Sequence, residues 1–145
     1  MEKVLEWQQK GFDGLCYINL VDFDMIYGHR RNIAGYTEAL NLFDVQLGEF
    51  LRNMKGDDLL FITADHGCDP SYKGTDHTRE TVPLLCYGPN LRKGVNLGTR
   101  STYADIAATL GDIFKIPYHG DGVSFASTGR NMPAIDGEIF STTLL

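Results

Sequence analysis

The feature that most constrains the fold is a long apolar stripe between two short apolar runs. From residue 33 to residue 54, apolar side chains recur at steps of three and four, which is the spacing of one face of a helix of about six turns. Residues 15–21 and 59–63 are the short, mostly apolar runs expected of strands that are covered on both faces. The helical stripe consists of Ile33, Tyr36, Leu40, Phe43, Leu47, Phe50 and Met54. The order strand, helix, strand predicts a parallel βαβ unit with a right-handed crossover.

The ends of this helix also carry sequence signals. Asn32 stands immediately before the stripe, where its side chain can cap the first turn. Lys55 and Gly56 follow the stripe, and a cationic residue followed by glycine is typical of a helix end. We therefore expect the helix to begin after Asn32 and to end at Lys55-Gly56.

The remainder of the chain predicts further α/β elements. Residues 64–81 form a polar, turn-rich segment that is too long for a simple connection. Residues 82–87 predict another strand, with Pro83 near its start or on an edge of the sheet, and residues 103–114 predict a second helix. The apolar face of that helix would be Tyr103, Ile106, Ala107, Leu110, Ile113 and Phe114. Residues 1–145 are thus expected to form a single α/β domain, the latter part of a doubly wound sheet.

Composition narrows the functional classes. The 145 residues include 13 Lys and Arg against 19 Asp and Glu, a net charge of −6. This acidic balance argues against nucleic acid as a partner, since non-specific binding to it needs basic surfaces. No apolar run approaches the about 18 residues of a membrane-spanning helix, so no membrane partner is expected. The three cysteines are widely separated, which fits the reducing cytoplasm better than a disulfide framework.

Acidic and imidazole side chains follow both predicted strands. Asp24 and His29 come after the first strand, Asp65 and His66 come after the second, and His77 lies in the polar loop beyond. Because the carboxyl ends of parallel strands share one edge of a sheet, we expect both pairs to meet there, with His77 folding back to join them. Mixed oxygen and nitrogen ligands suit Mn²⁺ or Zn²⁺ better than Ca²⁺. Structural interpretations remain open, because Asp24 could shape a turn and His77 could donate a loop hydrogen bond.

Longer stretches around these residues resemble a known family. Four segments carry the resemblance: 19–31 (NLVDFDMIYGHRR), 63–70 (TADHGCDP), 74–80 (GTDHTRE) and 82–89 (VPLLCYGP). Together they are similar to the phosphopentomutases, which belong to the alkaline phosphatase superfamily. The second segment is shared across that superfamily, including the cofactor-independent phosphoglycerate mutases. The first segment is more specific to the phosphopentomutases.

The resemblance implies an alkaline-phosphatase-like fold, a doubly wound, mostly parallel sheet with flanking helices. It also implies a reaction that moves phosphate between C1 and C5 of ribose or deoxyribose, with a phosphorylated pentose as substrate and two Mn²⁺ ions as cofactors. Carried over by motif, Asp24, His29 and His77 would hold one ion, and Asp65 and His66 the other. In such a site the two ions stabilise the attacking and leaving oxygens of an in-line displacement.

The family's chain is longer than this one. Its first strand, its threonine nucleophile and its cap domain have no match here, so we expect a C-terminal part that is inactive as a mutase on its own. Two alternatives stay open. The chain could be a non-catalytic metal- or phosphate-binding module, or a subunit completed by a complementary N-terminal chain. It could also belong to another branch of the superfamily, as a phosphatase, a sulfatase or a phosphoglycerate mutase.

Overall fold

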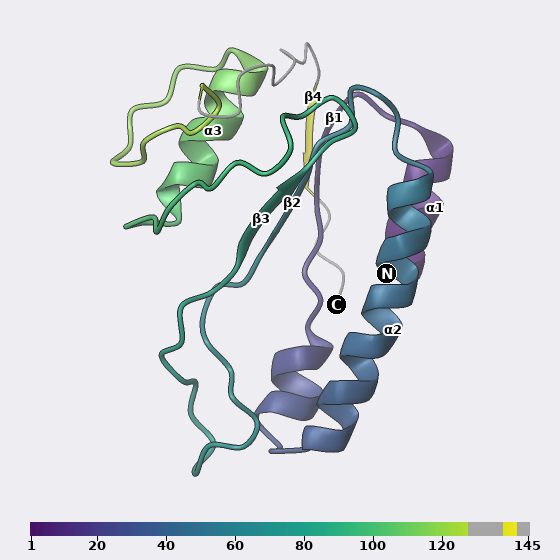
Figure 1. The fold of residues 1–145 in the computed structure, drawn as a ribbon, viewed down its shortest axis with the longest axis vertical. Helices are drawn as coiled ribbons and strands as arrows, with labels where there is room; N and C mark the ends of the chain where they lie inside the picture. The colour runs from purple at the N-terminus through teal and green to yellow at the C-terminus, as the bar shows by residue number, and fades with distance from the viewer. Residues whose placement is uncertain (128–137, 142–145) are drawn as a thin grey trace.

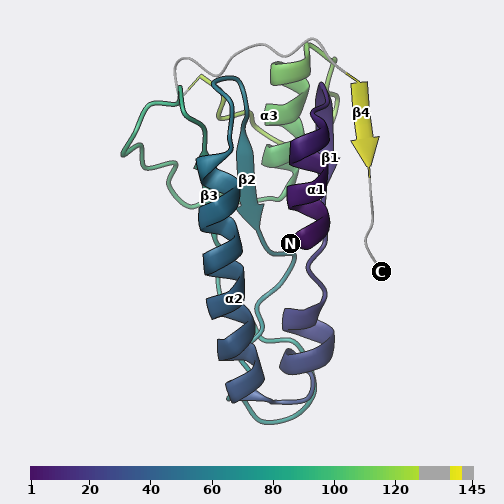
Figure 2. The same ribbon diagram turned by 90° about the vertical axis from the view of Figure 1, so that its right-hand side faces the viewer.

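Two helices pack against each other along one side of the molecule. The computed structural model describes residues 1–127 and 138–141. Helix α1 (Glu2–Lys10) lies beside α2 (Ile33–Arg52), and the Gln8 side chain joins them by donating a hydrogen bond of 2.9 Å to the carbonyl of Phe50 (Figures 1 and 2). Among the described helices, none has the length and hydrophobicity needed to cross a membrane.

Helix α2 confirms the long helix predicted from the apolar stripe. It begins as expected, with the Asn32 side chain accepting a hydrogen bond of 3.0 Å from the backbone amide of Gly35. Its predicted end is wrong, because the helix stops at Arg52 with Asn53 as the capping residue. The amide of Asn53 bonds to a carbonyl three residues back rather than four, which tightens and ends the last turn before Lys55-Gly56 is reached.

The strands pair in a way that the sequence pattern did not predict. Strand β1 (Gly14–Tyr17) pairs in parallel with β4 (Glu138–Ser141), which was not expected, and β2 (Leu60–Thr63) pairs antiparallel with β3 (Leu84–Tyr87). The described strands therefore form two two-stranded sheets and not one doubly wound parallel sheet. The α/β class and the strand, helix, strand order hold.

The connections explain this pairing. Between β2 and β3 lies a loop without the crossover helix that a parallel neighbour needs, so β3 returns antiparallel and begins directly after Pro83. Strands β2 and β4 point in the same direction in Figure 2, so β1, which is parallel to β4, also runs in the direction of β2. The two strands that flank α2 thus run the same way, although they do not pair with each other.

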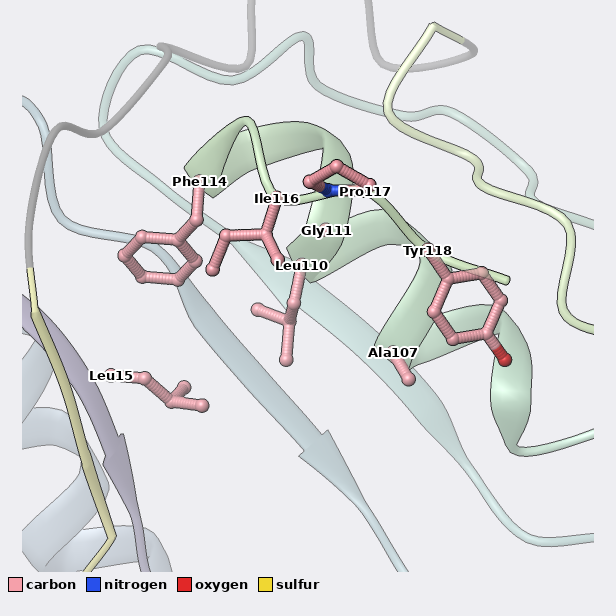
Figure 3. Close-up of a pocket in the computed structure, with 8 residues that line it drawn as sticks. All are labelled: Leu15, Ala107, Leu110, Gly111, Phe114, Ile116, Pro117 and Tyr118. Carbon is pink, nitrogen blue, oxygen red and sulfur yellow. The ribbon is translucent and has the colours of Figure 1, made fainter. Parts of the chain in front are cut away.

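Helix α3 (Ala104–Phe114) buries Ile113 from its predicted apolar face, but its other buried residues, Asp105, Ala108 and Thr109, lie outside that face. Residues 122–125 cover Asp105 and Thr109, and Phe125 is fully buried. Much of the predicted apolar face points elsewhere. Together with Leu15 of β1, it lines an apolar cavity of about 230 Å³ (Figure 3). The other lining residues are Ala107, Leu110, Gly111, Phe114, Ile116, Pro117 and Tyr118.

Candidate metal centre

Two irregular segments bring the predicted site residues to one end of the molecule. After β1 the chain enters a short π-helix, η1 (Asp22–Gly28), and after β2 it enters the long loop 64–83. Both segments reach the end of the molecule opposite α3 (Figure 1). The first strand is shorter than the predicted 15–21, so Asp24 lies in this π-helix and not in a loop at the strand end.

The π-helix gives a physical reason for the spacing of Asp24 and His29. The amide of His29 donates a hydrogen bond of 2.9 Å to the carbonyl of Asp24, which closes a turn between residues five positions apart. The two side chains are thereby brought one above the other, with His29 at the end of the helix. π-Turns of this kind are rare and often occur at functional sites.

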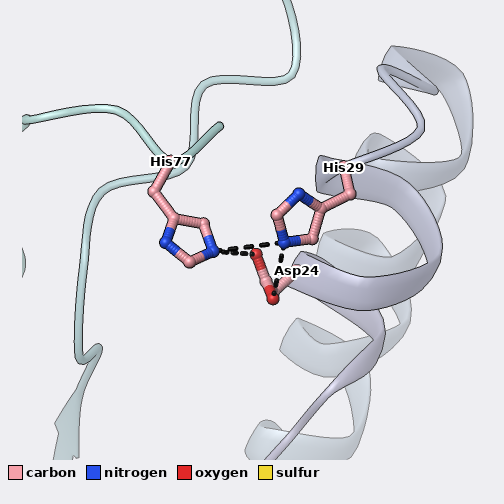
Figure 4. Close-up of side chains that lie close together, drawn as sticks. All are labelled: Asp24, His29 and His77. Atoms are coloured by element: carbon pink, nitrogen blue, oxygen red, sulfur yellow. Dashed lines mark hydrogen bonds and ion pairs between the residues drawn. The ribbon is translucent and has the colours of Figure 1, made fainter. Parts of the chain in front are cut away.

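Three side chains form the centre of the cluster (Figure 4). The Nε2 atoms of His29 and His77 lie 3.1 Å apart. The two carboxylate oxygens of Asp24 each approach one imidazole, with Oδ2 at 3.4 Å from His29 Nε2 and Oδ1 at 3.4 Å from His77 Nε2. One ligand atom from each of the three residues lies within 4.8 Å of the other two.

These positions fit a divalent cation. Asp24 Oδ1 is buried and accepts no hydrogen bond from any described residue, although a buried polar atom without a partner is costly. Two nitrogens that each lie about 2.1 Å from one ion are separated by roughly 3.0–3.4 Å. The His29 to His77 separation of 3.1 Å falls in this range. The donor set of one carboxylate and two imidazoles is typical of Zn²⁺ and Mn²⁺ sites.

The orientation of His29 suits a ligand. Its Nδ1 lies 2.5 Å from the backbone carbonyl of Thr75. A proton on Nδ1 therefore bonds to that carbonyl and leaves the lone pair on Nε2, which faces Asp24 and His77. His66 has a similar arrangement, with Nδ1 at 3.0 Å from the carbonyl of Gly67.

The other two predicted ligands lie beside this centre. His66 stacks on His77 with ring centroids 3.6 Å apart, and its Nε2 is 3.9 Å from Asp24 Oδ1. Asp65 Oδ1 is 3.6 Å from the same Nε2, and the Asp65 side chain is 89% exposed. The structure thus brings all five predicted residues together, with His66 and the exposed Asp65 beside the three-residue centre.

Cys68 lies next to the cluster but outside it. Burial raises the pKa of its thiol, and the nearby negative charge of Asp24 raises it further. Cys68 is also not one of the residues whose ligand atoms converge, which are Asp24, His29 and His77. Its sulfur packs against the buried Gly28. We interpret Cys68 as a packing residue and not as a ligand.

The loop that carries His77 is held in place by contacts that sequence reasoning missed. The guanidinium of Arg31 donates hydrogen bonds to three of its backbone carbonyls, those of Asp69, Gly74 and Asp76. A bridge between Gly67 and Thr78 closes the base of the loop. Every residue has a backbone carbonyl, so a sequence does not indicate which carbonyls will accept such hydrogen bonds. The two adjacent arginines before α2, Arg30 and Arg31, were the one signal from which these contacts could have been found.

Comparison with known proteins agrees with this donor set. The profile of a family described as the Metalloenzyme superfamily matches residues 1–118. The chain belongs to the metalloenzyme superfamily. All five residues of the cluster fall within the range of this metalloenzyme chain that the profile matches.

The metalloenzyme chain is also homologous to phosphopentomutases, as the motifs indicated. It is 52% identical over 125 residues to the phosphopentomutase of Lachnoclostridium phytofermentans, covering 86% of this chain and 32% of the relative. With that of Acetivibrio thermocellus it shares 54% identity over 125 residues, again 86% and 32% of the two chains. With that of Caldanaerobacter subterraneus subsp. tengcongensis it shares 58% over 113 residues, 77% and 28%. The chain thus spans about a third of the length of these relatives.

Proposed function

We propose that this chain is the metal-binding part of a phosphopentomutase, which moves phosphate between C1 and C5 of ribose or deoxyribose. The observation that carries the proposal is the meeting of Asp24, His29 and His77, with a buried Asp24 oxygen that lacks a hydrogen-bond partner among the described residues. The substrate class is taken from the phosphopentomutases that are about half identical to this chain.

In this proposal, Asp24, His29 and His77 hold one Mn²⁺ ion, and Asp65 and His66 contribute to a second. The carboxylates offset the charge of the ions, while the carbonyls of Thr75 and Gly67 orient His29 and His66. Bound divalent ions would neutralise charge on the transferring phosphoryl group, which is the main demand of such a reaction. The same donors also accept Zn²⁺, so availability in the cell helps to select the metal.

We infer that the rest of a full-length protein completes the doubly wound, mostly parallel sheet. Strands β1 and β2 run in the same direction, and each has one partner among the described strands. Two residues of the apolar stripe on α2 also remain open, with Ile33 53% and Leu40 46% exposed. Added chain would cover these surfaces, and we propose that it also supplies the nucleophile and the sugar-binding groups.

Calorimetric titration with Mn²⁺ tests the metal site. The chain should bind Mn²⁺ at neutral pH, and affinity should fall toward about pH 6 because an imidazole must lose its proton to bind. Asp24→Asn and His77→Ala should each weaken Mn²⁺ binding by about tenfold or more. Removing a residue that only supports a metal ligand already lowers metal affinity by about 10–100-fold. His119→Ala is the matched control, since this exposed histidine lies outside the cluster. Unchanged titrations for both cluster variants would defeat the ligand assignment.

A mutase assay tests the reaction. A full-length protein that contains this chain should convert ribose 1-phosphate to ribose 5-phosphate in the presence of Mn²⁺ and should lose this activity with Asp24→Asn. The 145-residue chain alone should show no turnover, because it spans about a third of the relatives' length. Release of inorganic phosphate without the isomerised sugar would instead indicate a phosphatase.

A further inference from the structure

We propose that Arg31 is a positioning residue for the metal centre, holding the loop 69–77 against η1 so that His77 meets Asp24 and His29 before any metal binds. The inference rests on the proposed metal site, and it goes beyond it by naming what keeps an exposed ligand in place. His77 is the ligand that needs such support, because it comes from a loop and its side chain is 46% exposed.

Arg31 binds this loop through backbone carbonyls. Nη1 donates to the carbonyl of Asp69 at 2.7 Å, Nη2 donates to that of Asp76 at 2.6 Å, and Nε donates to that of Gly74. Of these acceptors, Asp76 is the residue immediately before His77. Only the planar fork of an arginine offers donors in this spread, since a lysine ammonium has one nitrogen.

The backbone at Arg31 is adapted to this contact. Its φ is 53°, in the left-handed region, and its amide donates a hydrogen bond of 3.0 Å to the carbonyl of Gly28. A residue with a side chain is uncommon in this conformation and is retained only where other contacts compensate for it. The three carbonyl contacts of the guanidinium are such a compensation. They join the turn after η1 to the loop that follows β2.

The contacts of His29 strengthen the same connection. His29 Nδ1 lies against the carbonyl of Thr75, between two carbonyls that Arg31 contacts. The loop is therefore fixed to the η1 end by one metal ligand and by one arginine. Arg30 provides a contrast, because it is exposed and makes no hydrogen bond or ion pair with any described residue.

Positioning of this kind changes affinity through the population of the binding-competent state. When a ligand residue is in place only part of the time, the apparent dissociation constant rises by the inverse of that fraction. Without its three contacts to Arg31, the loop would have to be ordered by the metal itself. We expect Mn²⁺ affinity to fall by roughly tenfold to a hundredfold, the range seen when supporting partners of metal ligands are removed.

The experiment compares three variants of the 145-residue chain: Arg31→Met, Arg31→Lys and the control Arg30→Met. Mn²⁺ affinity is measured by calorimetry, and amide hydrogen exchange of residues 69–77 is measured without metal. Arg31→Met should bind Mn²⁺ at least tenfold more weakly and exchange faster in this loop, while exchange in α2 stays unchanged. Arg31→Lys should restore only part of both properties, and Arg30→Met should match the unmodified chain.

Co²⁺ absorption adds a readout that a general loss of stability would not change. If His77 no longer binds the ion, the visible bands of bound Co²⁺ should shift in Arg31→Met toward those of His77→Ala. Wild-type affinity and wild-type loop exchange in Arg31→Met would overturn the proposal. If that variant does not fold, Arg31→Lys is judged by the same two measurements.

Failure of the metal site itself would look different. In that case the unmodified chain would bind no Mn²⁺, and the proposed function would fall. Loop exchange without metal would still decide the role of Arg31, since faster exchange in Arg31→Met than in Arg30→Met supports it and equal exchange refutes it.

Discussion

Gly28 is the position at which one added carbon should disturb the candidate metal centre most. It is buried within η1, directly before His29. A Cβ built on Gly28 would lie 2.3 Å from the sulfur of Cys68 and 2.7 Å from the backbone oxygen of Phe23. Both separations are far below van der Waals contact, so Gly28→Ala requires one or both neighbours to move.

The size of the movement can be worked out from these separations. For an ordinary contact of at least about 3.5 Å, the sulfur must retreat by about 1.2 Å. The Phe23 oxygen must shift by about 0.6 Å to reach a carbon to oxygen contact of about 3.3 Å. The cysteine side chain can rotate, whereas the oxygen belongs to the π-helix itself. Overpacking of this kind costs typically about 1–3 kcal/mol.

The shift should also damage the metal site, because ligand distances tolerate only about 0.2 Å. Urea unfolding and Mn²⁺ titration of Gly28→Ala measure the two effects, and both stability and affinity should fall. Gly48→Ala is the matched control, since its new carbon would meet only the end of the Arg52 side chain at 3.6 Å. Alanine in that helix interior should stabilise by up to about 1 kcal/mol.

A second substitution separates the two clashes. Adding Cys68→Ala to Gly28→Ala removes the sulfur contact but leaves the contact with the Phe23 oxygen. The double variant should regain part of its stability and little of its Mn²⁺ affinity. Wild-type stability and affinity in Gly28→Ala alone would refute the close packing of the π-turn on which the reasoning rests.

Two further predictions concern the buried network around α3. Thr109 and Phe125 are both 0% exposed, and the Thr109 hydroxyl accepts a hydrogen bond of 3.1 Å from the Phe125 amide. Thr109→Val should therefore lower the free energy of unfolding by about 1–3 kcal/mol, measured by urea unfolding. An unchanged midpoint would show that the amide has another partner. The Val123 amide and then the Arg100 guanidinium hold the pKa of Asp105 below its usual range. Because this pKa is lower in the folded state, the stabilisation is complete above about pH 4 and is lost as pH falls through the folded-state pKa. Unfolding midpoints of the unmodified chain and Asp105→Asn should differ most at neutral pH and converge in acid, and a constant difference would contradict this linkage.

The local elements could be predicted from sequence because their causes are local. The steps of three and four along residues 33–54 follow from helix geometry, and Asn32 caps the helix as expected. The pairing of the strands could not be predicted in this way. Pairing depends on which distant segment reaches each strand edge. Nothing in the apolar run at 15–21 indicates that β4 will be its partner. The buried side of α3 could not be predicted for a similar reason. Its polar residues Asp105 and Thr109 are buried by a segment more than ten residues further along the chain.

The structure brings the five predicted site residues together, but partly for a reason other than the expected one. Metal-type side chains after two apolar runs indicated a shared location, and the structure brings Asp24 within 3.9 Å of His66. The expected cause was neighbouring ends of paired parallel strands, but β1 and β2 do not pair in the described chain. A π-turn and a clamped loop bring the residues together instead. Arg31 escaped prediction because its partners are carbonyls, which every residue has.

Because a π-turn and a loop assemble the candidate site without paired strands, the chain should bind a cation by itself. The η1 end is held by its own contacts: Phe23 packs on Tyr36 and Phe43 of α2 at 5.5 and 6.2 Å between ring centroids, and Arg31 holds the loop. None of these contacts involves an unpaired strand edge or the apolar cavity beside α3. Cation binding and phosphoryl transfer should therefore be separable, with the first present in the 145-residue chain and the second dependent on added chain. Were removal of the remaining protein to abolish Mn²⁺ binding while η1 and α2 stayed folded, the site would depend on the sheet after all.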